Sequence, residues 1–214
     1  MIADQALGQE WTLTEDQSDP DQQSLAFTYP RSDLTLAPIA YLAPSVKIEF
    51  GARSDHWPAE IKQVEPYLGE AIPDALQEAK IEVKVMDVRR TFWEKATILH
   101  QMAHLPPDKP FPARHSRHYC DVAEMITSKV ADQAANNEKL LKAVVDHKQT
   151  FYRSAWANYP TARRGTLRLL PPDERIAELA KDLGSMREMF FDQPPDLNRV
   201  LQTLDDWVSA FNRA

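Results

Sequence analysis

A lysine and an aspartate in the middle of the chain stand where packing alone would not place them. Lys95 lies in the string RRTFWEKATILHQMAH, and Asp121 ends the string RHSRHYCD. At about 100° of rotation per residue, Phe92, Ala96 and Leu99 form one apolar helical stripe, and Lys95 lies at its edge. We therefore expect an ammonium and a carboxylate on two helices at the rim of a shared cleft, where together they could bind a phosphorylated ligand.

The two helices have candidate starting residues. Thr91 and Glu94 have the spacing of a capping box, and Ser116 is expected to open the second helix. Asp121 points away from the apolar face of that helix, on the side of Arg117. A simpler interpretation is a lysine that extends its ammonium to water and an aspartate in a solvated ion pair with the arginine four residues earlier. Periodicity leaves both interpretations open.

A third candidate lies on a predicted strand. Val46, Ile48 and Phe50 alternate with Lys47 and Glu49, which is the period-two pattern of a half-buried strand. The pattern presents Glu49 to a cleft or to water, where a carboxylate could help to hold a catalytic metal ion. The alternative is an exposed cross-strand face of lysine and glutamate.

The order of the predicted elements indicates an α+β fold. Alternation predicts strands at residues 10–15, 24–29, 34–42, 45–51 and 80–86, whereas residues 58–65 and 71–79 read as short helices or ordered loop. From Thr91 onward, helical periods and prolines predict a bundle with helices at about 137–156, 173–191 and 196–213. We therefore expect a sheet region over residues 1–90 and a helical domain over residues 91–214.

Several strings in this order match a known family. The run RTFWEKATILH, followed by SRHYCD, VVDHK and MREMFF, resembles the AbiEii family of nucleotidyltransferase toxins of type IV toxin–antitoxin systems. The resemblance extends from about the KIEFGARSDHWP segment to the C-terminus. It implies part of a polymerase-β-like mixed sheet followed by a helical bundle. It also implies that Lys95 and Asp121 match catalytic residues, with Glu49 as the acid that binds Mg²⁺.

The resemblance implies a reaction and partners. The complete enzyme would transfer a nucleoside monophosphate from a nucleoside triphosphate, with magnesium, to an acceptor such as tRNA, as a phage-defence toxin with a cognate antitoxin. Lys95 would neutralise triphosphate charge, and Asp121 would orient that lysine or the acceptor. Lys47, Arg114 and Arg117 are candidates for nucleotide binding, although a small arginine cluster also fits a solvated face.

Two elements of the family's pattern are absent from the sequence. Family members carry a Gly-rich segment and an Asp-x-Asp pair, which bind the triphosphate and two magnesium ions. The five glycines here are too far apart for such a loop, and the one Asp-x-Asp string, Asp19-Pro20-Asp21, follows no glycine loop. We therefore expect a downstream portion that is inactive alone. The alternative is a non-catalytic module that binds an antitoxin, a nucleic acid or a second copy of itself through an open sheet edge.

Composition limits the remaining possibilities. A net charge of −7 argues against a broad nucleic-acid surface but leaves room for local basic patches, one around Arg117 and one at Arg163, Arg164 and Arg168. The sequence has no secretory leader and no apolar run of membrane-spanning length, so we expect a cytoplasmic protein without membrane contact.

The metal-ligating and thiol residues favour structural roles. Cys120 is the only cysteine, which excludes an intrachain disulfide and favours a packing role. His100 and His104 have the spacing of a metal-binding helix, but Gln101 replaces the glutamate of a zinc protease and no third ligand is evident. We expect both histidines to be structural.

Overall fold

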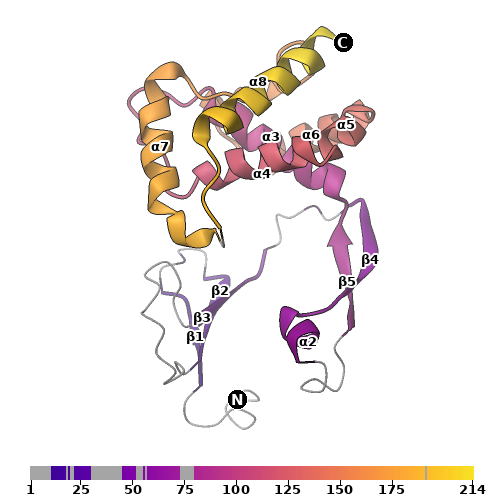
Figure 1. Cartoon of the computed structure of the whole chain (residues 1–214), viewed down its shortest axis with the longest axis vertical. Helices are drawn as coiled ribbons and strands as arrows, with labels where there is room; N and C mark the ends of the chain where they lie inside the picture. Colours follow the sequence, from indigo (N-terminus) through magenta and orange to yellow (C-terminus); the bar gives the residue numbers. More distant parts are fainter. Residues whose placement is uncertain are drawn as a thin grey trace. The chain divides into compact units, whose positions relative to one another are not determined.

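The computed structural model describes residues 11–17, 19, 22–29, 45–51, 55, 57–72, 80–190 and 192–214. The chain forms two compact units, shown with their elements in Figure 1. Unit 1 comprises Met1–Ser54 with Ser185–Gln193, and unit 2 comprises Asp55–Gly184 with Pro194–Ala214. Helices and two small antiparallel sheets among the described residues confirm the predicted α+β class.

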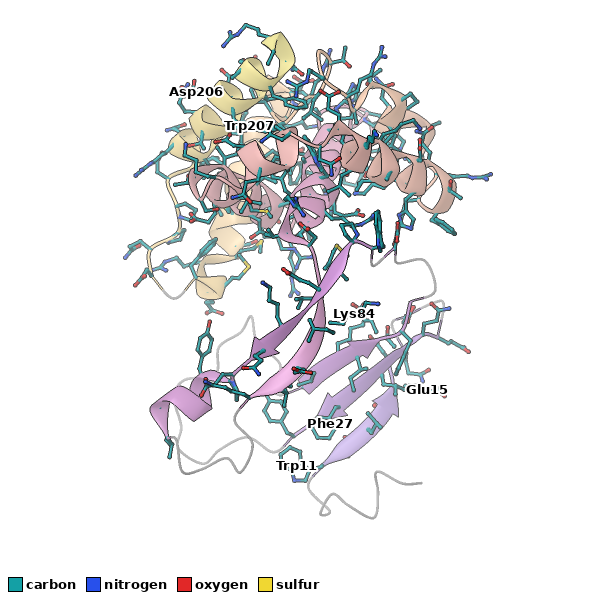
Figure 2. All side chains as sticks on the ribbon, turned by 90° about the vertical axis from the view of Figure 1, so that its right-hand side faces the viewer. Trp11, Glu15, Phe27, Lys84, Asp206 and Trp207 are labelled. Carbon is teal, nitrogen blue, oxygen red and sulfur yellow. The ribbon has the colours of Figure 1, made fainter. Side chains whose placement is uncertain are left out.

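Unit 1 contains a three-stranded antiparallel sheet in the order β1 (Thr12–Glu15), β2 (Ser24–Thr28) and β3 (Ser45–Glu49). These strands confirm the predictions at residues 10–15, 24–29 and 45–51, whereas the strand predicted at 34–42 lies outside the described residues. On one face of the sheet, the rings of Trp11 and Phe27 stack with centroids 5.5 Å apart (Figure 2). Alternation therefore predicted these strands, but the half-buried face expected for β3 was wrong, because Val46 is 52% and Ile48 39% exposed.

Unit 2 begins with a two-stranded hairpin, β4 (Ala59–Val64) and β5 (Ile81–Met86), with the short helix α2 (Tyr67–Ala71) between the strands. The expectation of a short helix or loop at 58–65 was wrong. The sequence AEIKQV has little alternation of its own, and its conformation is set by the ladder to β5, in which Ala59 pairs with Met86 and Val64 with Ile81. Of the segment expected at 71–79, residues 73–79 lie outside the described residues.

The hairpin belongs to the same compact unit as the helices. β5 leads directly into α3 (Val88–Met102), and the Asp87 N–H donates to the Pro58 carbonyl at 2.9 Å. The compact units consequently divide at residue 54, and residues 55–90 group with the helices. These units are defined by contacts, and the predicted domain boundary at residue 90 stays a prediction.

The helices of unit 2 after α3 are α4 (Ser116–Thr127), α5 (Val130–Ala135), α6 (Glu138–Phe151), α7 (Ile176–Ser185, whose last residue falls in unit 1) and α8 (Leu197–Arg213). Short 3-10 turns occupy Ala155–Ala157, Tyr159–Thr161 and Asp173–Arg175, and a fourth, Arg187–Met189, belongs to unit 1. The predicted helices at 137–156 and 173–191 are thus each shorter than expected. None of the helices in the described part of the chain combines the length and the apolar composition needed to cross a membrane.

Helix α3 lies at the centre of the core, as its apolar stripe predicted. Phe92, Trp93, Ala96 and Leu99 are fully buried. The Phe92 ring contacts Trp207 of α8 edge-on, with centroids 5.1 Å apart. Burial of such aromatic side chains contributes most of the packing energy of a core of this size. The core therefore fixes the orientation of α3 and of every side chain on its rim.

The start of α3 differs from the prediction. Asp87 caps the helix, because its Oδ1 accepts a hydrogen bond from the Arg89 N–H at 2.8 Å. Thr91 and Glu94, predicted to form a capping box, lie within the helix instead, where Glu94 binds Arg90 one turn earlier. The capping-box spacing was present, but the aspartate upstream satisfies the first-turn amides and extends the helix by one turn.

Candidate functional site

Lys95 and Asp121 meet across two helices of unit 2. Lys95 Nζ on α3 donates to Asp121 Oδ2 on α4 at 2.7 Å, although 26 positions separate the residues in the sequence. Their side chains are 27% and 42% exposed, so a ligand can reach both. In the described part of the chain, the ion-pair partner of Asp121 is Lys95 and not Arg117. The structure therefore brings together the two residues that the sequence singled out.

Two residues close to Asp121 on α4, His118 and Cys120, are uncharged at neutral pH. Burial lowers the pKa of His118 to about 4, and the positive charges of Lys95 and His115 add to the effect. Burial and the neighbouring carboxylate of Asp121 raise the pKa of the Cys120 thiol to about 11. His118 is therefore neutral at pH 7 and adds no charge to the basic patch, and Cys120 is a thiol with no nucleophilic character.

The N-terminus of α4 is capped from another helix. Asp182 of α7 accepts hydrogen bonds from the Arg114 N–H at 2.6 Å and from the Ser116 N–H at 2.8 Å. Ser116 opens the helix, as the sequence predicted, but its side chain does not cap the helix, because the cap is supplied by Asp182. This cap holds the helix that carries Asp121, and it leaves the exposed Arg117 one turn from that carboxylate.

Glu49 and Lys47 belong to unit 1 and pair with each other. Lys47 Nζ lies 3.0 Å from Glu49 Oε1 and 3.2 Å from Asp16 Oδ2, and these carboxylates raise the pKa of Lys47. The Glu49 side chain is 70% exposed. This is the contact expected of an exposed strand face. Lys95 and Asp121 belong to unit 2, and their convergence with Glu49 stays a prediction.

The described residues do not form a magnesium site. Among residues 11–17, 19, 22–29, 45–51, 55, 57–72, 80–190 and 192–214, no three His, Cys, Asp or Glu side chains gather closely enough to hold a metal ion. A two-metal site needs several carboxylates, and Glu49 supplies one that a lysine already neutralises. These residues therefore do not fit the metal that the resemblance implies.

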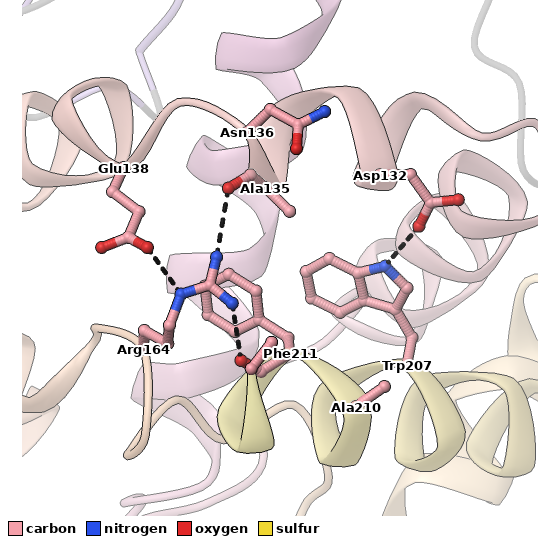
Figure 3. Close-up of a pocket in the computed structure, with 9 residues that line it drawn as sticks. Asp132, Ala135, Asn136, Glu138, Arg164, Trp207, Ala210 and Phe211 are labelled. Atoms are coloured by element: carbon pink, nitrogen blue, oxygen red, sulfur yellow. Dashed lines mark hydrogen bonds and ion pairs between the residues drawn. The ribbon is translucent and has the colours of Figure 1, made fainter.

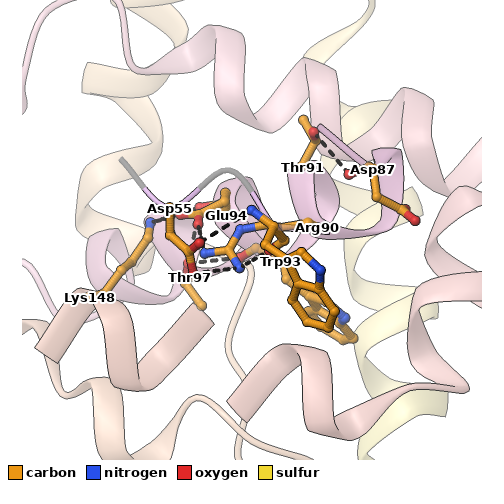
Figure 4. A network of polar contacts seen from close by, with 9 residues as sticks. Asp55, Asp87, Arg90, Thr91, Trp93, Glu94, Thr97 and Lys148 are labelled. Atoms are coloured by element: carbon orange, nitrogen blue, oxygen red, sulfur yellow. Dashed lines mark hydrogen bonds and ion pairs between the residues drawn. The ribbon is translucent and has the colours of Figure 1, made fainter. Parts of the chain in front are cut away.

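A buried ion network, which the sequence analysis missed, lies next to Lys95 on α3 (Figure 4). The Arg90 side chain is 1% exposed and donates to Glu94 Oε1 at 3.0 Å and to the Trp57 carbonyl at 2.6 Å, and its Nη1 lies 3.1 Å from Asp55 Oδ2. Lys148 of α6 donates to the Glu94 carbonyl at 2.8 Å, and its Nζ lies 3.6 Å from Glu94 Oε2. The only sequence signal was the four-residue spacing of Arg90 and Glu94, and exposed pairs share this spacing.

Lys148 is the most perturbed cation of this network. Burial lowers the pKa of its ammonium to about 8, against the opposing effect of the Glu94 carboxylate. Lys148 is only 6% exposed. Because it contacts Glu94, the neighbour of Lys95, the network fixes the helical turn from which Lys95 extends. The network therefore positions Lys95, and its own buried groups are not arranged to bind a ligand.

His100 and His104 are structural, as the sequence indicated. His100 Nδ1 accepts from the Arg168 N–H at 3.1 Å, and its Nε2–H lies 3.2 Å from the Asn158 carbonyl. His104 Nδ1–H donates to the His100 carbonyl at 2.8 Å, and its Nε2 accepts from Asn158 Nδ2 at 3.1 Å. Burial lowers the pKa of His100 to about 4. All four ring nitrogens are therefore engaged within the protein, and none remains for a metal.

The second predicted basic patch is partly structural. Arg164 donates to Glu138 Oε1 at 2.5 Å, to the Phe211 carbonyl at 3.0 Å and to the Ala135 carbonyl at 3.2 Å, and its guanidinium lies over the Phe211 ring (Figure 3). It thus binds carbonyls at the ends of α5 and α8. Arg163 and Arg168 are exposed. The patch therefore retains two arginines that are accessible to a ligand.

Comparison with known proteins gives the family. The family described as nucleotidyl transferase AbiEii toxin, type IV TA system, matches residues 3–212. No curated protein and no solved structure gave a match. The match covers nearly the whole chain, including Lys95, Asp121 and both units. The chain therefore belongs to the AbiEii family of nucleotidyltransferase toxins of type IV toxin–antitoxin systems.

Proposed function

We propose that this chain is a cytoplasmic toxin component that binds the triphosphate of a nucleoside triphosphate at Lys95, for nucleotidyl transfer to an acceptor such as tRNA in phage defence. The observation that carries the proposal is the 2.7 Å contact between Lys95 and Asp121, made by two helices of one unit at an accessible position. In the transfer reaction, an acceptor hydroxyl forms a bond to the α-phosphorus and pyrophosphate leaves. The lysine neutralises charge that builds on the leaving group.

The geometry of the pair suits this role. An ammonium group has three donor hydrogens, and Asp121 occupies one of them. Two donors of Lys95 remain for phosphate oxygens, while the carboxylate holds the ammonium in place. Arg117, exposed and one turn from Asp121, can contact a second phosphate. Magnesium would enter with the nucleotide, bound chiefly by the phosphates, as is usual for this ion.

We further propose that the chain alone does not complete the transfer. The sequence contains no glycine loop and no Asp-x-Asp pair in a suitable context. Without several carboxylates, two metal ions cannot be held at the α-phosphorus. Incubation with radiolabelled nucleoside triphosphates, magnesium and total tRNA should therefore label no RNA. Labelling by the purified chain would contradict this part of the proposal.

Titration calorimetry with UTP and with GTP, each in the presence of magnesium, tests the role of Lys95. The wild-type chain should show saturable binding, and Lys95→Ala should weaken it at least about tenfold, the effect of one charge-assisted phosphate contact. Lys62→Ala is the matched control, because it removes one lysine of an exposed pair, Lys62 with Glu60 at 3.1 Å, away from Lys95 in the sequence. Equal affinities of the wild-type and Lys95→Ala proteins would refute the assignment.

A second candidate function is a non-catalytic module that binds the cognate antitoxin. The observation in its favour is the sheet of unit 1, on which several large apolar side chains are more than one-third exposed: Trp11, Leu13, Tyr29, Val46, Ile48 and Phe50. Apolar surface on an open sheet tends to be covered by a partner. Absence of nucleotide binding together with a stable complex with the antitoxin, or a dimer in sedimentation velocity, would favour this candidate.

A further inference from the structure

A continuous groove runs along α6 in unit 2. One hollow, of about 560 Å³, lies between the α6 residues Lys139, Lys142 and Gln149 and the segment that contains Pro160 and Arg163. A second hollow, of about 350 Å³, also includes Gln149 and Pro160 and continues to Arg153 and Asn158. Because the two hollows share lining residues, they form one surface feature, which we call the α6 groove.

The α6 groove carries an excess of positive charge. Its two carboxylates, Glu138 and Asp146, each pair with a groove cation, Arg164 and Lys142 respectively. Three further exposed cations, Lys139, Arg153 and Arg163, have side chains without an ion-pair partner among the described residues. The protein as a whole has a net charge of −7. A local excess of this kind on an acidic protein attracts phosphates to this surface and not to the molecule in general.

The dimensions of the groove favour a single strand. From Lys139 to Gln149 the helix rises about 15 Å, at about 1.5 Å per residue. One turn of duplex DNA is about 34 Å long, so the groove covers less than half a turn. Lys139 and Lys142 lie one turn apart on α6, and Arg153 and Arg163 lie beyond the end of the helix and on the facing segment, an arrangement that suits contacts to successive phosphates of one strand.

Exposed aromatic side chains lie at the end of the same helix. Phe151 and Tyr152 are each 48% exposed, and in the chain they lie between the groove residues Gln149 and Arg153. The His147 ring supports them, with centroid distances of 4.9 Å to Phe151 and 5.9 Å to Tyr152. Unpaired bases stack on such rings irrespective of sequence, whereas the bases of a duplex are already stacked on each other.

We propose that the α6 groove binds a single-stranded nucleic acid, with its phosphates on Lys139, Arg153 and Arg163 and its bases on Phe151 and Tyr152. An acidic peptide would also satisfy the cations, but it has no use for the two exposed rings. One part of this proposal rests on the proposed function: the identification of the strand as the acceptor of the transfer. RNA with an unpaired end would suit both the transfer reaction and the α6 groove. The binding itself depends on unit 2 alone.

Fluorescence anisotropy tests the proposal with the full chain in the absence of nucleotide and magnesium. The probes are labelled RNA and DNA single strands of about ten nucleotides and of one sequence, a duplex of the same sequence, and a labelled oligoglutamate peptide. The wild-type chain should bind the single strands more tightly than the duplex or the peptide. Preference for RNA over DNA would identify RNA as the ligand, and the reverse preference would identify DNA; both support the groove.

Two double variants separate the contributions of charge and stacking. Lys139→Ala with Arg163→Ala should weaken binding at least about tenfold and reduce the slope of log affinity against log salt by about 1.4, which is about 0.7 for each phosphate contact. Phe151→Ala with Tyr152→Ala should weaken binding about fivefold or more without changing that slope. Lys181→Ala, which removes one exposed charge from α7 outside both hollows, should leave affinity unchanged.

Several results would overturn the proposal. The first is the absence of saturable binding of single strands by the wild-type chain at about 100 µM, a concentration at the weak end of non-specific binding. The second is equal or tighter binding of the duplex or the peptide. The third is unchanged affinity in the groove variants. Lys95→Ala should bind the single strand normally. If the wild-type chain binds the strand but no nucleotide, the result counts against the proposed function alone, and nucleotide binding without strand binding counts against the groove alone.

Discussion

The side chain of Lys148 is buried, and its ammonium group is held by contacts with Glu94. Since burial lowers its pKa from 10.5 to about 8, the unfolded chain binds more protons than the folded chain between these two values. The free energy of unfolding must then increase with pH over this range, and the full cost of burying the charge is present below about pH 8. The network is thus most costly at neutral pH.

This sign leads to a prediction for Lys148→Met, in which the titrating group is removed. Relative to the variant, the wild type should gain up to about 3 kcal/mol in free energy of unfolding as the pH rises from about 8 to about 10.5. Urea unfolding of both proteins at four pH values across this range measures the difference, and other titrating groups cancel. A difference that stays flat would show that Lys148 keeps an ordinary pKa in the folded protein.

The Lys95–Asp121 pair should contribute little to stability. Both side chains are partly exposed, and exposed ion pairs contribute about 0–1 kcal/mol. We predict that Lys95→Ala and Asp121→Asn each change the free energy of unfolding by less than about 1 kcal/mol. Chemical denaturation of the single and double variants gives the coupling energy directly. A loss of several kcal/mol would mark the pair as structural and would weaken the proposal that it serves a ligand.

At the scale of elements, the orientation of α4 depends on Asp182. This carboxylate replaces the N-cap side chain that the helix lacks. Asp182→Ala should therefore cost about 1–2 kcal/mol, the usual range for a lost cap, and should increase amide exchange in the first turn of α4. Native-state hydrogen exchange with urea denaturation measures both effects.

The control for this variant is Asp196→Ala. Asp196 caps α8 by accepting from the Arg199 N–H at 2.9 Å. The control should lose comparable stability but leave the amides of α4 protected. Equal protection of the first turn of α4 in the wild type and Asp182→Ala would mean that the contacts of Asp182 do not hold this helix.

The elements were predictable from the sequence where local pattern decides them. The buried stripe of α3 was predicted correctly because that helix buries one face, and the strand β3 was predicted from its alternation although its apolar side chains are exposed. The strand β4 and the cap of α4 were not, because β4 takes its conformation from β5, and the carboxylate that caps α4 lies 66 positions away from Ser116. Such long-range partners leave no periodic trace in a single sequence.

The candidate site was predictable only in part, for the same reason. Lys95 was singled out as a charge at the edge of an apolar stripe and Asp121 by the family resemblance, and their contact agrees with the expectation that the two helices share a cleft. Arg90 and Lys148 were overlooked because they bind groups in other segments. Arg90 donates to the Trp57 carbonyl, which precedes β4, and Lys148 donates to the Glu94 carbonyl in α3. Nothing in their own segments marks either residue as buried. The contact of Lys47 with Glu49 fits a surface strand as well as a site.

At the scale of the whole molecule, the two units differ in how deeply their elements are buried. Trp93, Ala96 and Leu99 of α3 are fully buried, whereas every residue of β1 is exposed. We predict that amides of the sheet of unit 1 exchange at least about 100-fold faster than those of α3, because local opening there exposes little new apolar surface. Residue-resolved hydrogen exchange measures this, and equal rates in both elements would indicate that a single cooperative body unfolds.

The guanidinium of Arg90 sets a lower limit on any shortened version of unit 2. The guanidinium donates to the Trp57 carbonyl and pairs with Asp55, and both residues precede β4. A fragment starting after residue 57 would keep the pair of Arg90 with Glu94 but lose these two acceptors, and a buried donor left unsatisfied costs about 1–3 kcal/mol. The smallest autonomously folding piece that contains Lys95 and Asp121 should therefore start at or before Asp55.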